Sequence, residues 1–148
     1  TFYSTDTPKH EIYKWDHNLV TGEISNKKVF TTIPVDLGIP DGMTVDAEGF
    51  VWSAIWYGGM VVRFDPDGKE ERRVEFPAAQ TSSAMFGGKD LNELYVTTAT
   101  FGTGDPQPTG WEPPNFNLDS YRGGDLYRVK LDIGGKPEFI TDFASSVS

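Results

Sequence analysis

The sequence predicts an all-β protein built from repeated blade-like sheets, and three observations lead to this prediction. Helical periodicity is nearly absent over the 148 residues, because proline or glycine interrupts most windows in which an amphipathic helix could form. Ten prolines and sixteen glycines accompany 14% aromatic residues, a composition typical of short strands joined by tight turns. The third observation is that a similar series of strand signals occurs three times along the chain.

Each repeated unit contains an aromatic strand, an alternating strand with a basic residue, a glycine turn and an outer strand. The aromatic strands contain Tyr3, Trp52 and Tyr95, which follow one another at intervals of 49 and 43 residues. Repeats of about 40–50 residues with about four strands each are typical of β-propeller blades. A two-sheet sandwich, the alternative, does not predict a recurring order of glycine turn and aromatic strand.

The strands are expected in chain order, with the inner strand of each blade preceding the aromatic one. The first unit lacks this inner strand, and an insertion at about 101–123 interrupts the third. Because a ring closes with about four to eight blades, we expect 1–148 to be part of a propeller whose N-terminal half is another chain or segment. The expected strands are 1–6, 11–16 and 28–30, then 38–45, 50–57, 60–65 and 73–77, then 82–86, 93–98, 125–130 and 138–140.

Composition excludes several classes of function. A net charge of −9 argues against nucleic acid as a partner, because phosphate binding requires clustered Lys and Arg. No apolar run approaches the ~20 residues of a membrane-spanning helix, so no membrane partner is expected. The chain has no cysteine, which excludes disulfides, a thiolate nucleophile and Cys-based metal sites. Together with the absence of an Asn-x-Ser/Thr acceptor, this favours a cytoplasmic protein. The charged run 69–73 is interpreted as a solvated hairpin face.

Asp41 is the leading candidate for chemistry. It lies in a Pro-Asp-Gly corner, where proline fixes φ before the acid and Gly42 frees the backbone after it. A carboxylate held in this way at the mouth of a strand suits a metal ligand or a general base. A plain turn is the alternative interpretation of these three residues. Two further acids, Asp46 and Glu48, are expected to hold the next turn, and Asp6 either faces the pocket or caps a turn.

A family resemblance adds to this interpretation. The stretch 39–49, followed by Val51-Trp52 and 62–68, closely resembles the gluconolactonase family, which includes the regucalcin-like (senescence marker) proteins and the luciferin-regenerating enzymes. The resemblance continues through 77–99 and is weakest over 101–123. It implies a six-bladed propeller, of which this chain supplies about three blades in the C-terminal half. It also implies one divalent cation bound by a Glu, an Asn and the Asp of Pro-Asp-Gly, and only the last, Asp41, matches a residue here.

The resemblance and the residues together predict metal-dependent hydrolysis of a sugar lactone or related cyclic ester, active only as the complete propeller. Asp41 would act as metal ligand and general base, with Ca²⁺ as the expected metal and Zn²⁺, Mn²⁺ or Mg²⁺ as alternatives. The alternatives in function are a non-catalytic calcium- or ligand-binding propeller and a luciferin-regenerating activity.

Four residues are candidates for substrate binding. Trp56 and Tyr57 would line the mouth with flat amphipathic rings, or they would pack against the next blade. Thr81 and Ser83 would hydrogen-bond substrate hydroxyls, or they would hold a strand edge. The insertion is expected to be a lid, an interface or a surface loop without function.

Overall fold

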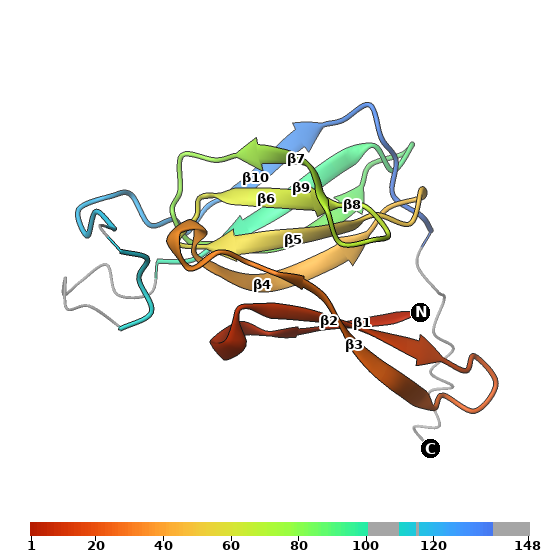
Figure 1. Ribbon diagram of the computed structural model, residues 1–148. Coiled ribbons are helices and arrows are strands. Elements are labelled where there is room, and N and C mark those ends of the chain that lie inside the picture. The colour runs from red at the N-terminus through yellow and green to blue at the C-terminus, as the bar shows by residue number, and fades with distance from the viewer. Residues whose placement is uncertain (101–109, 115, 138–148) are drawn as a thin grey trace, which may run out of the picture.

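The computed structural model describes residues 1–100, 110–114 and 116–137, which form three antiparallel sheets (Figure 1). In this part of the chain the only helical elements are two single-turn 3₁₀ helices, η1 (Thr7–Lys9) and η2 (Val35–Leu37). The predicted all-β class is therefore confirmed. Each sheet corresponds to one of the three repeated units.

The first sheet consists of β1 (Phe2–Asp6), β2 (Glu11–His17) and β3 (Ile24–Thr32) in that order. The edge of β1 that faces away from β2 has no partner among the described residues. This is the edge at which the sequence predicts that an inner strand is missing. The 3₁₀ turn η1 joins β1 to β2 and packs on the start of β4 in the next sheet.

The middle sheet has four strands in chain order: β4 (Ile39–Val45), β5 (Val51–Trp56), β6 (Met60–Phe64) and β7 (Glu70–Glu75). The third sheet consists of β8 (Thr81–Gly87), β9 (Glu93–Thr98) and β10 (Leu126–Lys130). The predicted inner strands 38–45 and 82–86 are confirmed as β4 and β8. The predicted outer strand 138–140 lies outside the described residues.

The middle sheet packs on its neighbours through both of its faces. Successive residues of a strand point to opposite faces, so β5 contributes to two different cores. Val51 and Ile55 pack with residues of the first sheet, whereas Trp52 and Ala54 pack with the third sheet. The middle sheet is therefore covered by the first sheet on one face and by the third sheet on the other. This packing explains why the sequence of β5 and β6 is almost continuously apolar.

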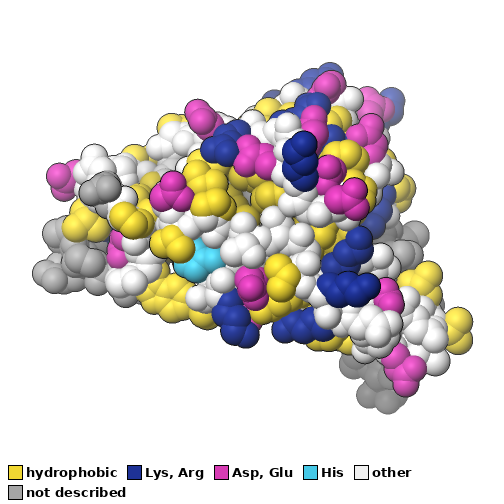
Figure 2. All heavy atoms as spheres, in the orientation of Figure 1, with side chains coloured by type: hydrophobic (Ala, Val, Ile, Leu, Met, Phe, Trp, Pro, Cys, Tyr) yellow, Lys and Arg dark blue, Asp and Glu magenta, His cyan; other side chains and the backbone are white. Residues whose placement is uncertain are grey.

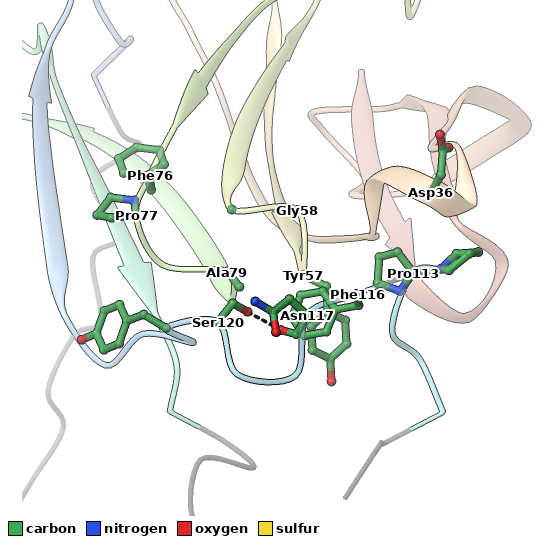
Figure 3. A pocket seen from close by; sticks show the side chains of 13 residues that line it. Asp36, Tyr57, Gly58, Phe76, Pro77, Ala79, Pro113, Phe116, Asn117 and Ser120 are labelled. Atoms are coloured by element: carbon green, nitrogen blue, oxygen red, sulfur yellow. Dashed lines mark hydrogen bonds between the residues drawn. The ribbon is translucent and has the colours of Figure 1, made fainter. Parts of the chain in front are cut away.

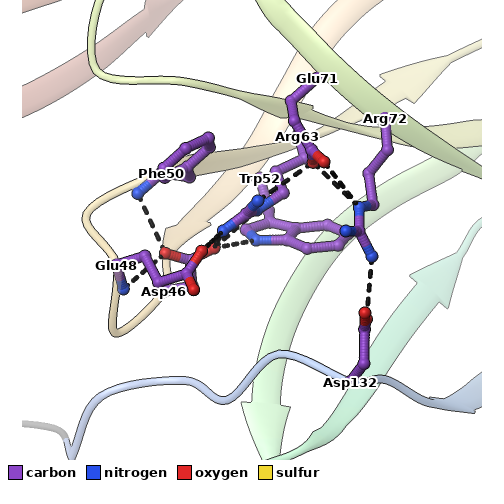
Figure 4. Close-up of polar contacts among 8 residues, drawn as sticks. All are labelled: Asp46, Glu48, Phe50, Trp52, Arg63, Glu71, Arg72 and Asp132. Carbon is purple, nitrogen blue, oxygen red and sulfur yellow. Dashed lines mark hydrogen bonds and ion pairs between the residues drawn. The ribbon is translucent and has the colours of Figure 1, made fainter.

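A buried polar cluster joins the middle and third sheets (Figure 4). The Asp46 carboxylate, whose side chain is 0% exposed, accepts hydrogen bonds from the indole N–H of Trp52 and from Nε of Arg63, each at 2.8 Å. It also accepts the backbone N–H groups of Glu48 (2.9 Å) and Phe50 (3.0 Å). The prediction that Asp46 holds a turn is confirmed. Its contact with a buried arginine was not foreseen.

Arg63 is the cation of this cluster, and its side chain is only 3% exposed. Besides Asp46 it contacts Glu48 and, at 3.0 Å, Glu71. Burial by itself lowers the pKa of Arg63, but the three carboxylates raise it, and the guanidinium stays charged. The cluster continues through Arg72, whose Nη1 lies 2.8 Å from Asp132 in the segment that follows β10.

The outer strand β7 carries charges of both signs. Figure 2 shows them mixed along one edge of the molecule, over β7. Arg73 pairs with Glu70 at 2.7 Å, and Arg72 pairs with Glu71 at 2.9 Å. The charged run is therefore a solvated strand and turn, as predicted. Across the described ranges, no helix is long and apolar enough to cross a membrane.

Candidate active site around Asp41

Asp41 lies in a β-bulge on β4, the inner strand of the middle sheet. Pro40 pairs with Ile55 of β5 and Met43 pairs with Ser53, so Asp41 and Gly42 together stand opposite the single residue Ala54. A bulge interrupts the ladder of backbone hydrogen bonds and changes the direction of a side chain, and bulges often lie beside active sites. The Pro-Asp-Gly sequence therefore forms a bulge within a strand, not an isolated turn.

The first sheet holds this corner from one side. The hydroxyl of Thr5 donates a hydrogen bond to the carbonyl of Asp41 at 3.1 Å, and the hydroxyl of Thr7 donates to the carbonyl of Pro40 at 2.9 Å. The Nδ1 atom of His10 lies 3.1 Å from the carbonyl of Gly38. Three backbone carbonyl groups in and just before β4 thus have side-chain partners in the first repeated unit.

The third sheet holds the corner from the other side. A Cβ atom built on Gly42 would lie 2.5 Å from Oγ of Ser83 and 2.8 Å from the carbonyl oxygen of Ser82. Only glycine allows the two inner strands β4 and β8 to approach so closely at this point. Ser83 is consequently a direct neighbour of the Asp41 corner, although its hydroxyl is not shown to bind anything there.

Burial controls the charge of Asp41. Loss of solvent around the half-buried side chain raises its pKa above the ordinary value of 3.8, and the backbone N–H of Gly42 opposes this only in part. No charged group contributes to the shift. A half-buried carboxylate without a cation is costly for the fold and suits a site whose cation comes from outside.

The raised pKa predicts a pH-dependent gain in stability for Asp41→Asn. Folded wild type binds the proton more tightly than unfolded chain does, so its stability falls as pH rises from 3.8 through the folded-state pKa. At pH values above the folded-state pKa, the neutral amide of Asp41→Asn avoids the free-energy cost of a partly buried charged carboxylate. We expect metal-free full-length Asp41→Asn to have a higher Tm than wild type at pH 7, with the difference disappearing as pH falls toward 3.8. Equal Tm values throughout, measured calorimetrically in chelator, would contradict this expectation.

The four predicted substrate-binding residues are not brought together in one hollow. Thr81 is fully buried, and its hydroxyl lies 2.8 and 2.9 Å from the carbonyl oxygens of Ile55 and Met60. This placement favours the strand-edge role that the sequence left open for Thr81. Ser83 is exposed and lines a hollow of about 390 Å³ between β4 and β8, together with Met43, Thr44, Val45, Ala84, Met85 and Lys136.

Tyr57 and the insertion form a second hollow, of about 410 Å³ (Figure 3). The ring of Tyr57 packs edge-on against Phe116 at 4.9 Å, and its hydroxyl donates to Glu112 at 3.2 Å. Tyr57 is thus mainly a packing residue against the insertion. Trp56 is half-buried and its ring contacts the ring of Tyr57. Its backbone forms an isolated antiparallel β-bridge with Gln80, the residue just before β8. Both placements favour packing, the alternative that the sequence allowed.

No group of three His, Asp or Glu side chains in the described ranges could hold a metal ion. Asp41, the predicted metal ligand, is therefore not part of such a group among the described residues. Asp6 is the N-cap residue of η1, and its carboxylate pairs with Lys9 at 3.1 Å across this turn. This placement favours the turn role that the sequence left open for Asp6.

Sequence reasoning did not identify Thr5 and Thr7 as neighbours of the site, or Arg63 as the cation of the buried polar cluster. The Thr residues lie in the first repeated unit, 36 and 33 positions before their partners, and no local pattern indicates such a contact. Arg63 did carry a signal, because a charged residue within the apolar strand Met-Val-Val-Arg-Phe is unusual and requires a buried partner.

Comparisons with known proteins agree with this architecture. The family described as the SMP-30/Gluconolactonase/LRE-like region matches residues 1–100. Pentonolactonase XacC of Haloferax volcanii is 40% identical over 141 residues, 95% of this chain and 47% of that protein. Regucalcin of Sus scrofa is 43% identical over 140 residues, 93% of this chain and 44% of that protein. The chain therefore spans just under half the length of these relatives.

Solved structures show the same fold. A luciferin-regenerating enzyme superimposes with a TM-score of 0.76 at 30% identity, over 90% of this chain and 42% of that chain. A protein described as a calcium-binding protein, regucalcin, from Agrobacterium tumefaciens superimposes with a TM-score of 0.71 at 28% identity, over 90% of this chain and 43% of that chain. Both have propeller-type folds.

Proposed function

The chain belongs to the SMP-30/gluconolactonase/LRE-like family, and from this membership we propose that the full-length protein is a metal-dependent lactone hydrolase. The complete molecule would be a six-bladed propeller, with residues 1–148 contributing about three blades. Asp41 would be both a ligand of one divalent cation and the general base. The substrate would be a sugar lactone or a related cyclic ester.

The observation that carries this proposal is the state of Asp41. It lies in a bulge on an inner strand, its pKa is raised by burial, and no cation of the described chain pairs with it. Carboxylate oxygens suit hard cations such as Ca²⁺, Mg²⁺ and Mn²⁺, and Zn²⁺ also accepts them. The similarity to pentonolactonase XacC supports a lactonase. The similarity to regucalcins supports Ca²⁺ as the metal.

Lactone hydrolysis requires attack of water on the ring carbonyl carbon and cleavage of the ring C–O bond. Asp41 would orient the water and take its proton as the oxygen–carbon bond forms. The proton would then pass to the departing ring oxygen, giving a hydroxy acid. A divalent cation, when bound, would polarise the carbonyl group. Asp41 would be the general base and one ligand of the cation, and the other ligands of the cation would come from the remaining part of the protein.

We further propose that the remaining part pairs with the open edge of β1. An unpaired strand edge exposes backbone N–H and C=O groups and promotes association with other strands. We therefore expect the isolated 148-residue chain to self-associate, whereas the full-length protein has this edge covered. Sedimentation velocity together with circular dichroism tests this expectation. A stable, folded monomer of the isolated chain would contradict it.

A non-catalytic calcium-binding propeller is the second candidate, favoured by the similarity to regucalcins. The two functions separate in one experiment on the full-length protein. Hydrolysis of a panel of aldonolactones and other cyclic esters is followed by acid release, with and without chelator, and Ca²⁺ binding is measured by calorimetry. Chelator-sensitive turnover supports the hydrolase. Tight Ca²⁺ binding without turnover of any lactone would favour the calcium-binding protein. A protein that neither hydrolyses a lactone nor binds Ca²⁺ would contradict both candidate functions.

A further inference from the structure

The geometry points to Thr5 and Thr7 as positioning residues for Asp41, which would set the direction of its carboxylate from the neighbouring sheet. We propose that their two hydroxyl groups form a cross-sheet clamp on the corner Pro40-Asp41-Gly42. This inference rests on the proposed metal-binding role of Asp41 and extends it to residues that do not touch the cation or the substrate.

The clamp acts on both peptide groups that flank Asp41. The hydroxyl of Thr7 binds the carbonyl of Pro40, which belongs to the peptide group before Asp41, at 2.9 Å. The hydroxyl of Thr5 binds the carbonyl of Asp41 itself, which belongs to the peptide group after it, at 3.1 Å. The orientations of these two planes define φ and ψ of Asp41, and φ and ψ fix the direction of its Cα–Cβ bond.

The bulge makes such a clamp necessary. Asp41 and Gly42 stand opposite one residue of β5, so the sheet's own ladder does not hold both peptide groups in register. On the other side, the corner lies so close to β8 that a Cβ atom on Gly42 would clash with Ser83 and with the carbonyl of Ser82. The corner is therefore confined by the third sheet and held in orientation by the first.

The two threonines lie on a short rigid segment. Thr5 is in β1 and pairs with Ile12, whereas Thr7 opens the 3₁₀ turn η1, in which Pro8 fixes φ. His10, which closes this turn in a left-handed conformation, adds a third contact to the carbonyl of Gly38 at 3.1 Å. Three contacts from one loop to the residues around Asp41 indicate a specific support, because partners of metal ligands must be held as firmly as the ligands themselves.

Isosteric substitution tests the clamp in the full-length protein. Thr5→Val and Thr7→Val keep the side-chain shape and remove the hydroxyl. We expect each to raise the Kd for Ca²⁺, measured by calorimetry, by about tenfold, and the double variant by up to about 100-fold. Thr7→Ser, which keeps the hydroxyl, should restore nearly wild-type affinity. At saturating Ca²⁺ the lactonase kcat of the single variants should recover in part, because the cation itself then helps to orient Asp41.

Thr98→Val is the matched control. Its hydroxyl also donates to a backbone carbonyl, that of Asp125 at 2.7 Å, but in the third sheet. We expect it to lower Tm without changing the Kd for Ca²⁺. If Thr5→Val and Thr7→Val also lower Tm without changing the Kd for Ca²⁺, the two threonines have only a structural role and the inference is wrong. Should the double variant not fold, the single variants and Thr7→Ser decide the matter.

The same measurements separate this inference from the proposed function. Wild type that binds Ca²⁺, together with an Asp41→Asn variant that does not, would support the metal-binding role of Asp41. Unchanged threonine variants in that case would overturn the clamp alone. Wild type that binds no divalent cation would overturn the clamp and the metal-binding role together.

Discussion

Asp41→Asn in the full-length protein should lower the rate of lactone hydrolysis by about 10²–10⁴-fold, the usual contribution of a general base. The amide keeps the size of the side chain and one acceptor oxygen, but it cannot take a proton and is a weaker ligand for a hard cation. The Kd for Ca²⁺ should therefore rise as well. Initial rates at several Ca²⁺ concentrations and calorimetric titration measure the two effects separately.

The control for this experiment is Asp67→Asn in the exposed turn between β6 and β7, which removes the same charge far from the bulge. It should leave rate and affinity unchanged. Circular dichroism should show both variants folded, because Asp41 is a half-buried residue without a packing role. Unchanged turnover of Asp41→Asn at saturating metal would remove this residue from the mechanism.

Asp46→Asn should destabilise the protein by about 3–5 kcal/mol, the typical cost of breaking a buried ion pair by removing one partner. One carboxylate oxygen of Asp46 accepts from both Trp52 and Arg63 at 2.8 Å. An amide nitrogen in place of this oxygen is itself a donor, so it could not accept the hydrogen bonds from Trp52 and Arg63. Arg63 would also lose its most buried counter-charge. Urea unfolding of the full-length protein, followed by tryptophan fluorescence, measures the change.

Glu48→Gln is the matched control, because Glu48 contacts the same guanidinium but has a side chain that is 59% exposed. Solvent replaces a lost surface ion pair at little cost, so the expected change is below about 1 kcal/mol. A similar loss of stability in both variants would show that burial does not decide the strength of this cluster. A loss in Glu48→Gln alone would place the important counter-charge at the surface.

Most of the strand pattern could be predicted from the sequence because it depends on local signals. Alternating side chains, glycine turns and the repeat interval placed β4 and β8, and Asp46 was correctly expected to hold a turn. β5 is apolar at every position except Ser53, a pattern typical of a strand covered on both faces.

The environment of the site depends on contacts between sheets, and no local sequence pattern predicts such contacts. The contact of Thr7 with Pro40 joins residues 33 positions apart, and the contact of Tyr57 with Glu112 joins residues 55 positions apart. Thr81 was a candidate for substrate binding because it resembles the pocket-facing stretch of the gluconolactonase family, but its burial depends on how β8 meets the middle sheet. Only the arrangement of the sheets distinguishes a packing role from a binding role at these positions.

The position of β5 and β6 between two cores has a consequence for how the molecule opens. Both strands are buried along nearly their whole length, whereas β3 and β10 are largely exposed. Local opening is cheapest where few apolar contacts are lost, so it begins at the outer strands and reaches β5 and β6 only when a neighbouring sheet detaches. The bulge that carries Asp41 belongs to this central sheet, and its geometry therefore persists through the fluctuations that expose the periphery.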